Sequence, residues 1–305
     1  MIEISIVIPV YNSGKNLFGL ERQISEALSN ISHEIIFVND FSKDDSWNII
    51  KSLCNENKSI TGITFRKNYG QDNALLAGLR HAKGKYIVIM DDDLQHSPSD
   101  IPKLYEKCKE GFDICFANFR YKKQASWKNF GSWLNGRIAN ILLRKNRLIY
   151  LSPFKIIHHS IVESIQFNGP FPYIDGILLE LTNNVSAIEI THHSRLIGKS
   201  NYNLFRSISV FLKTLTSFSV IPLRIATILG FSFAFIGFGL GLYYLYEYFT
   251  HDTVEGWTTL IVTLLIIGGL MLMSIGLVGE YLGRLYLAIN NKPQYSIGEV
   301  IKELH

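Results

Sequence analysis

Residues 85–97 read Lys-Tyr-Ile-Val-Ile-Met-Asp-Asp-Asp-Leu-Gln-His-Ser. Residues 86–90 have the apolar character of a buried strand, and the run ends on three adjacent carboxylates, Asp91, Asp92 and Asp93. Adjacent carboxylates repel one another, so a fold tolerates them best where a cation binds. Asp91 and Asp93 can offer oxygens to one hard divalent ion such as Mg²⁺ or Mn²⁺. The alternative is a solvated acidic turn that caps the next helix, and the run alone does not separate the two.

Strand and helix patterns alternate around this run. The strand-like segments are Ile4–Val10, Glu34–Asn39, Ile60–Phe65, Tyr86–Met90 and Asp113–Ala117. The helix-like segments are Lys15–Leu28, Asp44–Cys54, Asn73–Ala82 and Ser99–Glu110. Strands of nearly continuous β-branched character, joined by helices, are typical of a parallel sheet that helices cover on both faces. The sequence therefore predicts an α/β fold with a Rossmann-like, mostly parallel sheet.

Polar clusters directly follow four of these strands. They are Pro9–Ser13, Asn39–Ser42, Arg66–Gln71 and Asp91–Asp93. Because parallel sheets bind ligands beyond the carboxyl ends of their strands, we expect these clusters to share one edge. Each cluster alone could be a turn, since turns favour the same residue types. Four clusters in register, one of them a carboxylate triplet, favour a binding site.

The class of ligand follows from the motifs around this edge. No GxGxxG sequence follows the first strand, and Ser13-Gly-Lys-Asn16 lacks the GxxxxGK[ST] spacing of a phosphate-binding loop. An acidic cluster without a full protein cage is typical of a metal ion that also binds a ligand's phosphates. A nucleoside diphosphate with its metal ion fits this edge. The mild net charge of +4 argues against a nucleic-acid partner.

Two long apolar segments lie near the C-terminus, Ile225–Phe249 and Thr258–Gly279. A bilayer core requires about 20 apolar residues in a helix, so both segments qualify as membrane spans. The alternative is a pair of buried helices in a large soluble core. Lys and Arg flank the segments but are absent from the loop between them. The positive-inside rule therefore predicts a multi-pass protein of the inner (plasma) membrane with both termini in the cytoplasm.

The predicted domain organisation follows this shift in composition. The segments are a cytoplasmic catalytic domain (1–203), a juxtamembrane helix (204–224), two transmembrane helices (225–283) and a cytoplasmic tail (284–305). Within the first domain, residues 126–148 place apolar residues at helical spacing with basic flanks. This pattern is typical of an amphipathic helix at a membrane interface. The alternative is a helix packed on the catalytic domain.

Four ordered motifs carry a family resemblance. Ser5–Asn12, Val38–Ser42, Lys67–Gly70 and Asp91–Gln95 resemble those of family 2 glycosyltransferases, which have a GT-A fold. Gly279–Arg284 and Asn291–Tyr295 resemble the branch that acts on polyprenyl phosphates, such as bactoprenol glucosyltransferases and dolichol-phosphate mannose synthases. The resemblance implies inverting, metal-dependent transfer of a hexose from a UDP-sugar to undecaprenyl phosphate on the cytoplasmic leaflet. Such a product supplies sugar for modification of cell-surface glycans, and the branch implies a homo-oligomer, a tetramer.

The resemblance also assigns a role to each matched residue. The residues that bind the nucleotide sugar would be Pro9, Tyr11, Asn12, Asp40, Lys67, Gln71, Asp91, Asp92 and Gln95. The residues that bind the lipid phosphate or diphosphate would be Arg195, Lys199, Ser200 and Tyr202. Asp91 and Asp93 would hold Mg²⁺ or Mn²⁺, and the catalytic residues would be Asp93, Asp175 and Arg195. The alternatives are a turn residue before Gly176 for Asp175 and, for Arg195 and Lys199, a basic patch attracted to anionic lipid.

The chain departs from the family pattern at three positions. Ser13 and Asn39 replace acidic residues, and Pro153 stands where several relatives have a catalytic aspartate. The loss of a base costs little here, because a phosphate monoester has a second pKa of about 6 and is mostly ionised at pH 7. Two other functions remain open: direct transfer of a sugar onto a lipid-linked oligosaccharide or glycolipid, and a catalytically silent membrane scaffold.

Overall fold

The computed structural model describes residues 2–119, 151–166, 172–190, 221–250, 256–289 and 293–302. The chain divides into two compact units, Met1–Leu204 with Lys292–His305, and Phe205–Asn291. The first contains the predicted catalytic domain and is called the catalytic unit. The strands are β1 (Ile4–Val10), β2 (His33–Asn39), β3 (Ile60–Phe65), β4 (Tyr86–Ile89), β5 (Ile114–Phe119), β6 (Lys155–His158), β7 (Val185–Ile190) and β8 (Ile297–Ile301). The helices of the catalytic unit are α1 (Gly14–Ala27), α2 (Ser46–Glu56), α3 (Gln71–His81), α4 (Ile101–Lys109), α6 (His159–Glu163) and α7 (Ile174–Leu181), with a short 3-10 turn over Pro98–Asp100.

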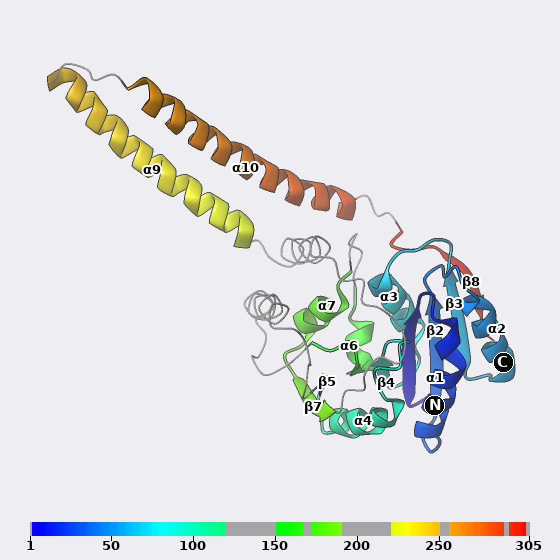
Figure 1. Cartoon of the computed structure of the whole chain (residues 1–305). Coiled ribbons are helices and arrows are strands. Elements are labelled where there is room, and N and C mark those ends of the chain that lie inside the picture. The colour runs from blue at the N-terminus through cyan, green and yellow to red at the C-terminus, as the bar shows by residue number, and fades with distance from the viewer. Residues whose placement is uncertain are drawn as a thin grey trace. The chain divides into compact units, whose positions relative to one another are not determined.

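The described strands form one sheet in the order β7-β5-β6-β4-β1-β2-β3-β8 (Figure 1). β1 pairs in parallel with β2 and β4, and β2 pairs in parallel with β3. β6 runs antiparallel to β4 and β5, and β8 runs antiparallel to β3 at the edge. This arrangement confirms the predicted mostly parallel α/β sheet.

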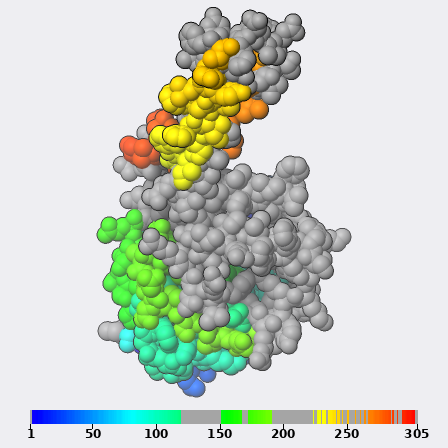
Figure 2. All heavy atoms as spheres, turned by 90° about the vertical axis from the view of Figure 1, so that its left-hand side faces the viewer, coloured from blue at the N-terminus to red at the C-terminus, as the bar shows by residue number. Residues whose placement is uncertain are grey.

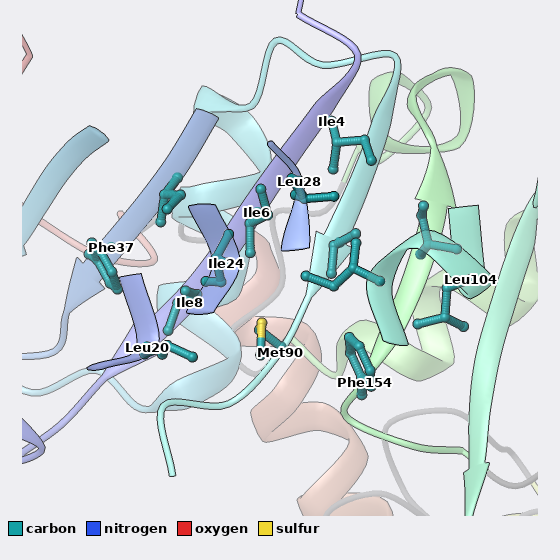
Figure 3. Packing of buried hydrophobic residues seen from close by; sticks show 14 of the residues in the cluster. Ile4, Ile6, Ile8, Leu20, Ile24, Leu28, Phe37, Met90, Leu104 and Phe154 are labelled. Carbon is teal, nitrogen blue, oxygen red and sulfur yellow. The ribbon is translucent and has the colours of Figure 1, made fainter. Parts of the chain in front are cut away.

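Helices cover both faces of the sheet. α1, α2 and α4 pack on one face, and α3, α6 and α7 pack on the other. β1 shows why the sheet needs both layers, because Ile4, Ile6 and Ile8 face the first layer whereas Val7 faces the second. Figure 3 shows these isoleucines beside Leu20 and the other apolar side chains of α1. Each such buried aliphatic side chain contributes about 1.5–3 kcal/mol of transfer free energy.

A glycine brings α3 close to the sheet. A Cβ atom on Gly78 would lie 2.3 Å from Cγ1 of Val7, so any larger residue would push α3 away from β1. The N-terminus of α3, at Gln71, follows the end of β3. This close packing therefore fixes the position of Gln71 at the edge where the predicted polar clusters lie.

The second unit contains two long apolar helices, α9 (Ile221–Thr250) and α10 (Trp257–Ile289), which contact one another. Large apolar side chains on them are exposed, such as Phe235 (82%) and Leu272 (73%), and atoms of α9, in yellow, lie on the face shown in Figure 2. Among the described residues, one segment, Ile266–Gly283, is long and apolar enough to cross a membrane, and Ala226–Leu240 is a shorter apolar segment.

The C-terminal residues return to the catalytic sheet. The sequence predicts a cytoplasmic tail over 284–305, and β8 within this segment extends the sheet beyond β3. Its residues, Ile-Gly-Glu-Val-Ile, are too short and too mixed for a clear strand signal. An edge strand needs little more than backbone pairing with its neighbour, which explains why periodicity alone did not predict it.

Candidate active site

The ends of the parallel strands carry unusual backbone conformations. Three residues other than glycine have positive φ in the described chain: Asn12 (55°), Phe41 (59°) and Leu94 (58°). They follow β1, β2 and β4, so all three lie on the carboxyl side of the sheet. Positive φ is uncommon for residues with bulky side chains and costs of order 1–3 kcal/mol. Such strain concentrates at functional sites, and it supports the edge that the sequence predicts.

Asp40 joins the second strand end to the third. Its carboxylate accepts hydrogen bonds from the backbone N–H groups of Tyr69 (2.6 Å) and Gly70 (2.8 Å). The side-chain amide of Asn68 donates to the carbonyl oxygen of Asp40 (3.1 Å). Burial raises the pKa of Asp40, and the two backbone bonds act against that rise. Each carboxylate oxygen keeps a second lone pair, so Asp40 can still accept a bond from a ligand.

The acidic run is tied to two neighbouring elements. Asp91 Oδ1 accepts a hydrogen bond from the side-chain amide of Gln71 on α3 (2.8 Å). Asp92 Oδ2 accepts from the backbone N–H of Tyr11 after β1 (3.4 Å). Asp93 Oδ1 accepts from the N–H of Gln95 within its own turn (3.1 Å). The carboxylates therefore lie beside the end of β1 and the N-terminus of α3.

Burial makes the ionisation of Asp91 and Asp92 unfavourable. Burial, followed by the charges of Asp93 and Asp92, raises the pKa of Asp91 to about 7. Burial also raises the pKa of Asp92 to about 6. A bound cation would remove this penalty, because an opposite charge nearby favours the ionised form. A cation at the acidic run would therefore stabilise the ionised forms of Asp91 and Asp92.

The carboxylates of the acidic run suit a metal ion that is also coordinated by a bound ligand better than one that is coordinated by the protein alone. Within the described ranges, no group of three or more His, Cys, Asp or Glu side chains is arranged to hold a metal ion. Mg²⁺ is commonly held by one or two carboxylates together with substrate phosphates and water. Asp91 and Asp93 are the residues that would hold such an ion together with the phosphates of a ligand.

A buried lysine, which the sequence did not single out, lies beside the acidic run. Lys155, on β6, pairs with Ile89, the last residue of β4. Its side chain is 3% exposed and forms an ion pair with Asp175 at the start of α7. The Lys155 charge also acts against the raised pKa values of Asp91 and Asp72. One signal could have found it, since a lysine inside the apolar run Phe154-Lys-Ile-Ile157 must be paired when the strand is buried.

Asp72 is the second acidic residue that sequence reasoning missed. It lies in the first turn of α3, and its Oδ1 accepts from the backbone N–H of Ile174 (3.5 Å). Burial raises its pKa to about 6, and the charge of Asp175 adds to the rise. Burial likewise raises the pKa of Tyr173. Asp72, Lys155 and Asp175 therefore form a charged cluster that joins α3, β6 and α7.

The remaining predicted residues fall into two groups. Of those described, Pro9 is buried in β1, Tyr11 is exposed (49%), and the Lys67 ammonium lies 5.0 Å from the centre of the Tyr69 ring. Asn12 Oδ1 accepts from the backbone N–H of Lys43 (2.8 Å). The residues predicted to bind the lipid phosphate lie outside the described residues, and they are Arg195, Lys199, Ser200 and Tyr202. The predicted amphipathic helix over residues 126–148 lies outside them as well.

Comparisons with known proteins agree with this geometry. Residues 5–166 match the family described as Glycosyl transferase family 2, and residues 221–285 match the GtrB C-terminal hairpin. The SfII prophage-derived bactoprenol glucosyl transferase of Shigella flexneri is 30% identical, and the alignment covers 100% of this chain and 99% of that protein. An undecaprenyl-phosphate 4-deoxy-4-formamido-L-arabinose transferase of Shewanella sediminis is 29% identical over 98% of this chain and 92% of that protein.

Solved structures agree at the level of the fold. Glucosyl-3-phosphoglycerate synthase from Mycobacterium tuberculosis, solved with Mn²⁺, uridine diphosphate and phosphoglyceric acid, aligns with a TM-score of 0.53 at 16% identity. The alignment covers 70% of this chain and 76% of that one. Sheet, site and matches together define a glycosyltransferase with a GT-A-like fold. The chain belongs to glycosyl transferase family 2 and carries the GtrB C-terminal hairpin.

Proposed function

We propose that this protein transfers a hexose from a UDP-sugar to a polyprenyl phosphate, undecaprenyl phosphate, with inversion at the anomeric carbon. The observation that carries the proposal is the convergence of Asp40, Asp91 and Asp93 at one sheet edge, in a chain that also has the apolar C-terminal hairpin. The names of the relatives, a bactoprenol glucosyl transferase and an undecaprenyl-phosphate transferase, support the acceptor.

In this proposal the residues of the edge bind and orient the donor. Asp40 and Tyr11 lie on the nucleoside side, and Asp91 and Asp93 hold a divalent ion at the diphosphate. The ion supplies charge neutralisation for the diphosphate as it leaves. Lys67, Gln71 and Gln95 complete the donor pocket, and Arg195, Lys199, Ser200 and Tyr202 bind the acceptor phosphate.

The acceptor needs little help with proton removal. A phosphate monoester has a second pKa of about 6, so most of it is ionised at pH 7. Asp175, the other acid of this chain that could serve near the acceptor, is paired with Lys155. Pro153, at the position of the usual aspartate, cannot act as a base. Positioning and charge neutralisation would then supply most of the rate enhancement.

The topology of the sheet supports a hairpin with both ends on one side of the membrane. β7 precedes α9 and α10 in the chain, and β8 follows them, yet both strands belong to one sheet. A chain that leaves and rejoins one folded unit must cross a bilayer an even number of times. We therefore propose two spans, with the catalytic unit and both termini in the cytoplasm, in the inner membrane.

Transfer is tested with the purified full chain in detergent or nanodiscs. The protein is incubated with undecaprenyl phosphate, Mg²⁺ or Mn²⁺ and a panel of radiolabelled nucleotide sugars, and the extracted lipid is counted. The proposal expects label in a monoglycosylated lipid from one UDP-hexose. Label that appears only when a lipid-linked oligosaccharide is supplied would instead favour direct transfer onto that acceptor. No transfer with any donor would favour a scaffold.

Two further measurements separate the parts of the proposal. Asp93→Asn should lower turnover at least about a hundredfold, because the variant loses a charge that holds the ion. Full turnover in this variant contradicts the metal assignment. We also propose a homotetramer, as the family resemblance implies, and the molar mass of the protein in detergent, measured by light scattering, checks this directly.

A further inference from the structure

The C-terminal tail reaches the loop that follows β3. Beyond the pairing of β8 with β3, the backbone N–H of Arg66 donates to the carbonyl oxygen of Ser296 (3.0 Å). The ring of Tyr295 stacks on that of Phe65, the last residue of β3, with centroids 5.0 Å apart and planes inclined by 21°. Figure 1 shows β8, in red, along this edge of the sheet. The tail therefore covers the end of β3 as well as its edge.

α3 holds the same tyrosine from a second side. The guanidinium of Arg80 lies 5.7 Å from the centre of the Tyr295 ring, and its Nη1 donates to the hydroxyl oxygen (3.2 Å). Tyr295 is thus half-buried between β3 and α3. Stacked and cation–π contacts of this kind fix both the position and the plane of a ring.

The contacts continue from Phe65 into the donor site. Phe65 also meets the ring of Tyr69 edge to face, with centroids 5.5 Å apart. The backbone N–H groups of Tyr69 and Gly70 are the two that donate to the Asp40 carboxylate. The loop of residues 66–70 is therefore held by Tyr295 through Phe65 at one end and by Asp40 at the other.

We propose that Tyr295 is a positioning residue for the nucleotide pocket, acting through Phe65 and the 66–70 loop on Asp40. This inference rests on the proposed function, because it takes the edge at Asp40 as the donor site. Without the ring, Phe65 and Tyr69 lose the surface that orders them, and the two N–H groups no longer hold the carboxylate in one place. Asp91 and Asp92 accept hydrogen bonds from Gln71 and Tyr11 rather than from Tyr295, so the chemical step should be spared.

The kinetic test compares Tyr295→Leu with a matched change on the same tail. Loss of an aromatic contact of this kind should raise the donor KM about three- to tenfold and leave kcat within about twofold. Tyr295→Phe keeps the stack on Phe65 and should restore most of the donor affinity. Glu299→Gln is the control, because Glu299 pairs with Lys51 and Trp47 away from the loop. An equal rise in KM for Glu299→Gln, or a fall in kcat alone for Tyr295→Leu, overturns the proposal.

Hydrogen exchange gives a readout that needs no substrate. The Tyr69 and Gly70 amides should exchange faster in Tyr295→Leu, return towards the wild-type rate in Tyr295→Phe and remain unchanged in Glu299→Gln. Unchanged exchange in folded Tyr295→Leu protein refutes the coupling. If that variant does not fold, Tyr295→Met, whose unbranched and flexible side chain adapts to the space that the ring leaves, is read by the same measurements. If wild-type protein transfers no sugar, the proposed function fails, while the exchange rates still decide whether the tail orders the loop.

Discussion

Replacing Lys155 with methionine should destabilise the catalytic unit strongly. The Lys155 side chain is 3% exposed, and its partner Asp175 has a side chain 16% exposed. Methionine keeps the apolar stem but removes the charge, so Asp175 and the neighbouring Asp72 lose the cation beside them. Breaking a buried ion pair by removing one partner costs roughly 3–5 kcal/mol. For a unit of 150–250 residues this corresponds to a fall in Tm of about 6–20 °C.

The assay is thermal unfolding of the full chain in detergent, followed by the fluorescence of its aromatic residues. The matched control is Lys51→Met, which removes an ammonium 3.0 Å from Glu299 on the surface, where the lysine side chain is 38% exposed. Exposed pairs are worth about 0–1 kcal/mol, so its Tm should fall by less than about 4 °C. The difference in Tm between Lys155→Met and Lys51→Met measures the effect of burial on the ion pair.

A double-mutant cycle with Asp175→Asn then isolates the pair itself. The double variant should be more stable than the sum of the two single changes predicts, by about 0.5–3 kcal/mol, because the second change removes the orphaned charge. Strict additivity, or a Tm for Lys155→Met equal to that of Lys51→Met, would refute the reasoning. Either result would mean that the Asp175 carboxylate is adequately solvated without Lys155.

Three further predictions use the same unfolding assay or nucleotide binding. Burial raises the pKa of Asp72 from 3.8 to about 6, so stability falls as pH rises from about 4 to 6, and the full cost is present above pH 6. Asp72→Asn should therefore raise Tm at pH 7.5, with a gain in the free energy of unfolding of at most about 3 kcal/mol, and most of this gain should vanish by pH 4. Gly78→Ala should lower Tm by several degrees, because the new methyl group meets Val7. Asp40→Asn should weaken UDP binding about tenfold in calorimetry, because the amide cannot accept from both loop N–H groups and a ligand.

Each of these predictions has a result that contradicts it. An Asp72→Asn gain that persists unchanged at pH 4 would show that charge is not its cause. Gly19→Ala is the control for the glycine, since nothing lies within 4 Å of a Cβ there and alanine favours the helix. Equal stability of the two alanine variants would contradict the close packing of α3. Unchanged UDP affinity in Asp40→Asn would remove Asp40 from the donor site.

Hydrophobic runs were sufficient to predict the central strands. The bounds of Ile4–Val10 and Ile60–Phe65 agree with β1 and β3 residue for residue, and those of β2 and β4 differ by one residue. These strands are apolar on both faces and end on polar clusters, so each signal is local. β6, β7 and β8 were not predicted, because they are short and mix polar with apolar residues.

The candidate site also has features that the sequence predicts and features that it does not. The acidic run, the polar ends of four strands and the four family motifs can be read from adjacent residues. The partners of these groups cannot, because Gln71 is 20 positions from Asp91 and Tyr69 is 29 from Asp40. Periodicity indicates which face of a helix or strand is buried. It does not indicate which side chains, distant in the sequence, pack against that face.

The sequence by itself therefore determined the family, the edge of the sheet where the polar clusters gather, and the apolar hairpin that follows the sheet-forming unit. Only the tertiary structure decided that Lys155 lies buried beside the acidic run, paired with Asp175, and that the tail closes the sheet with Tyr295 against Phe65. The physical reason is that both arrangements join segments far apart in the chain. Sheet order and helix packing, which no local pattern encodes, bring those segments together.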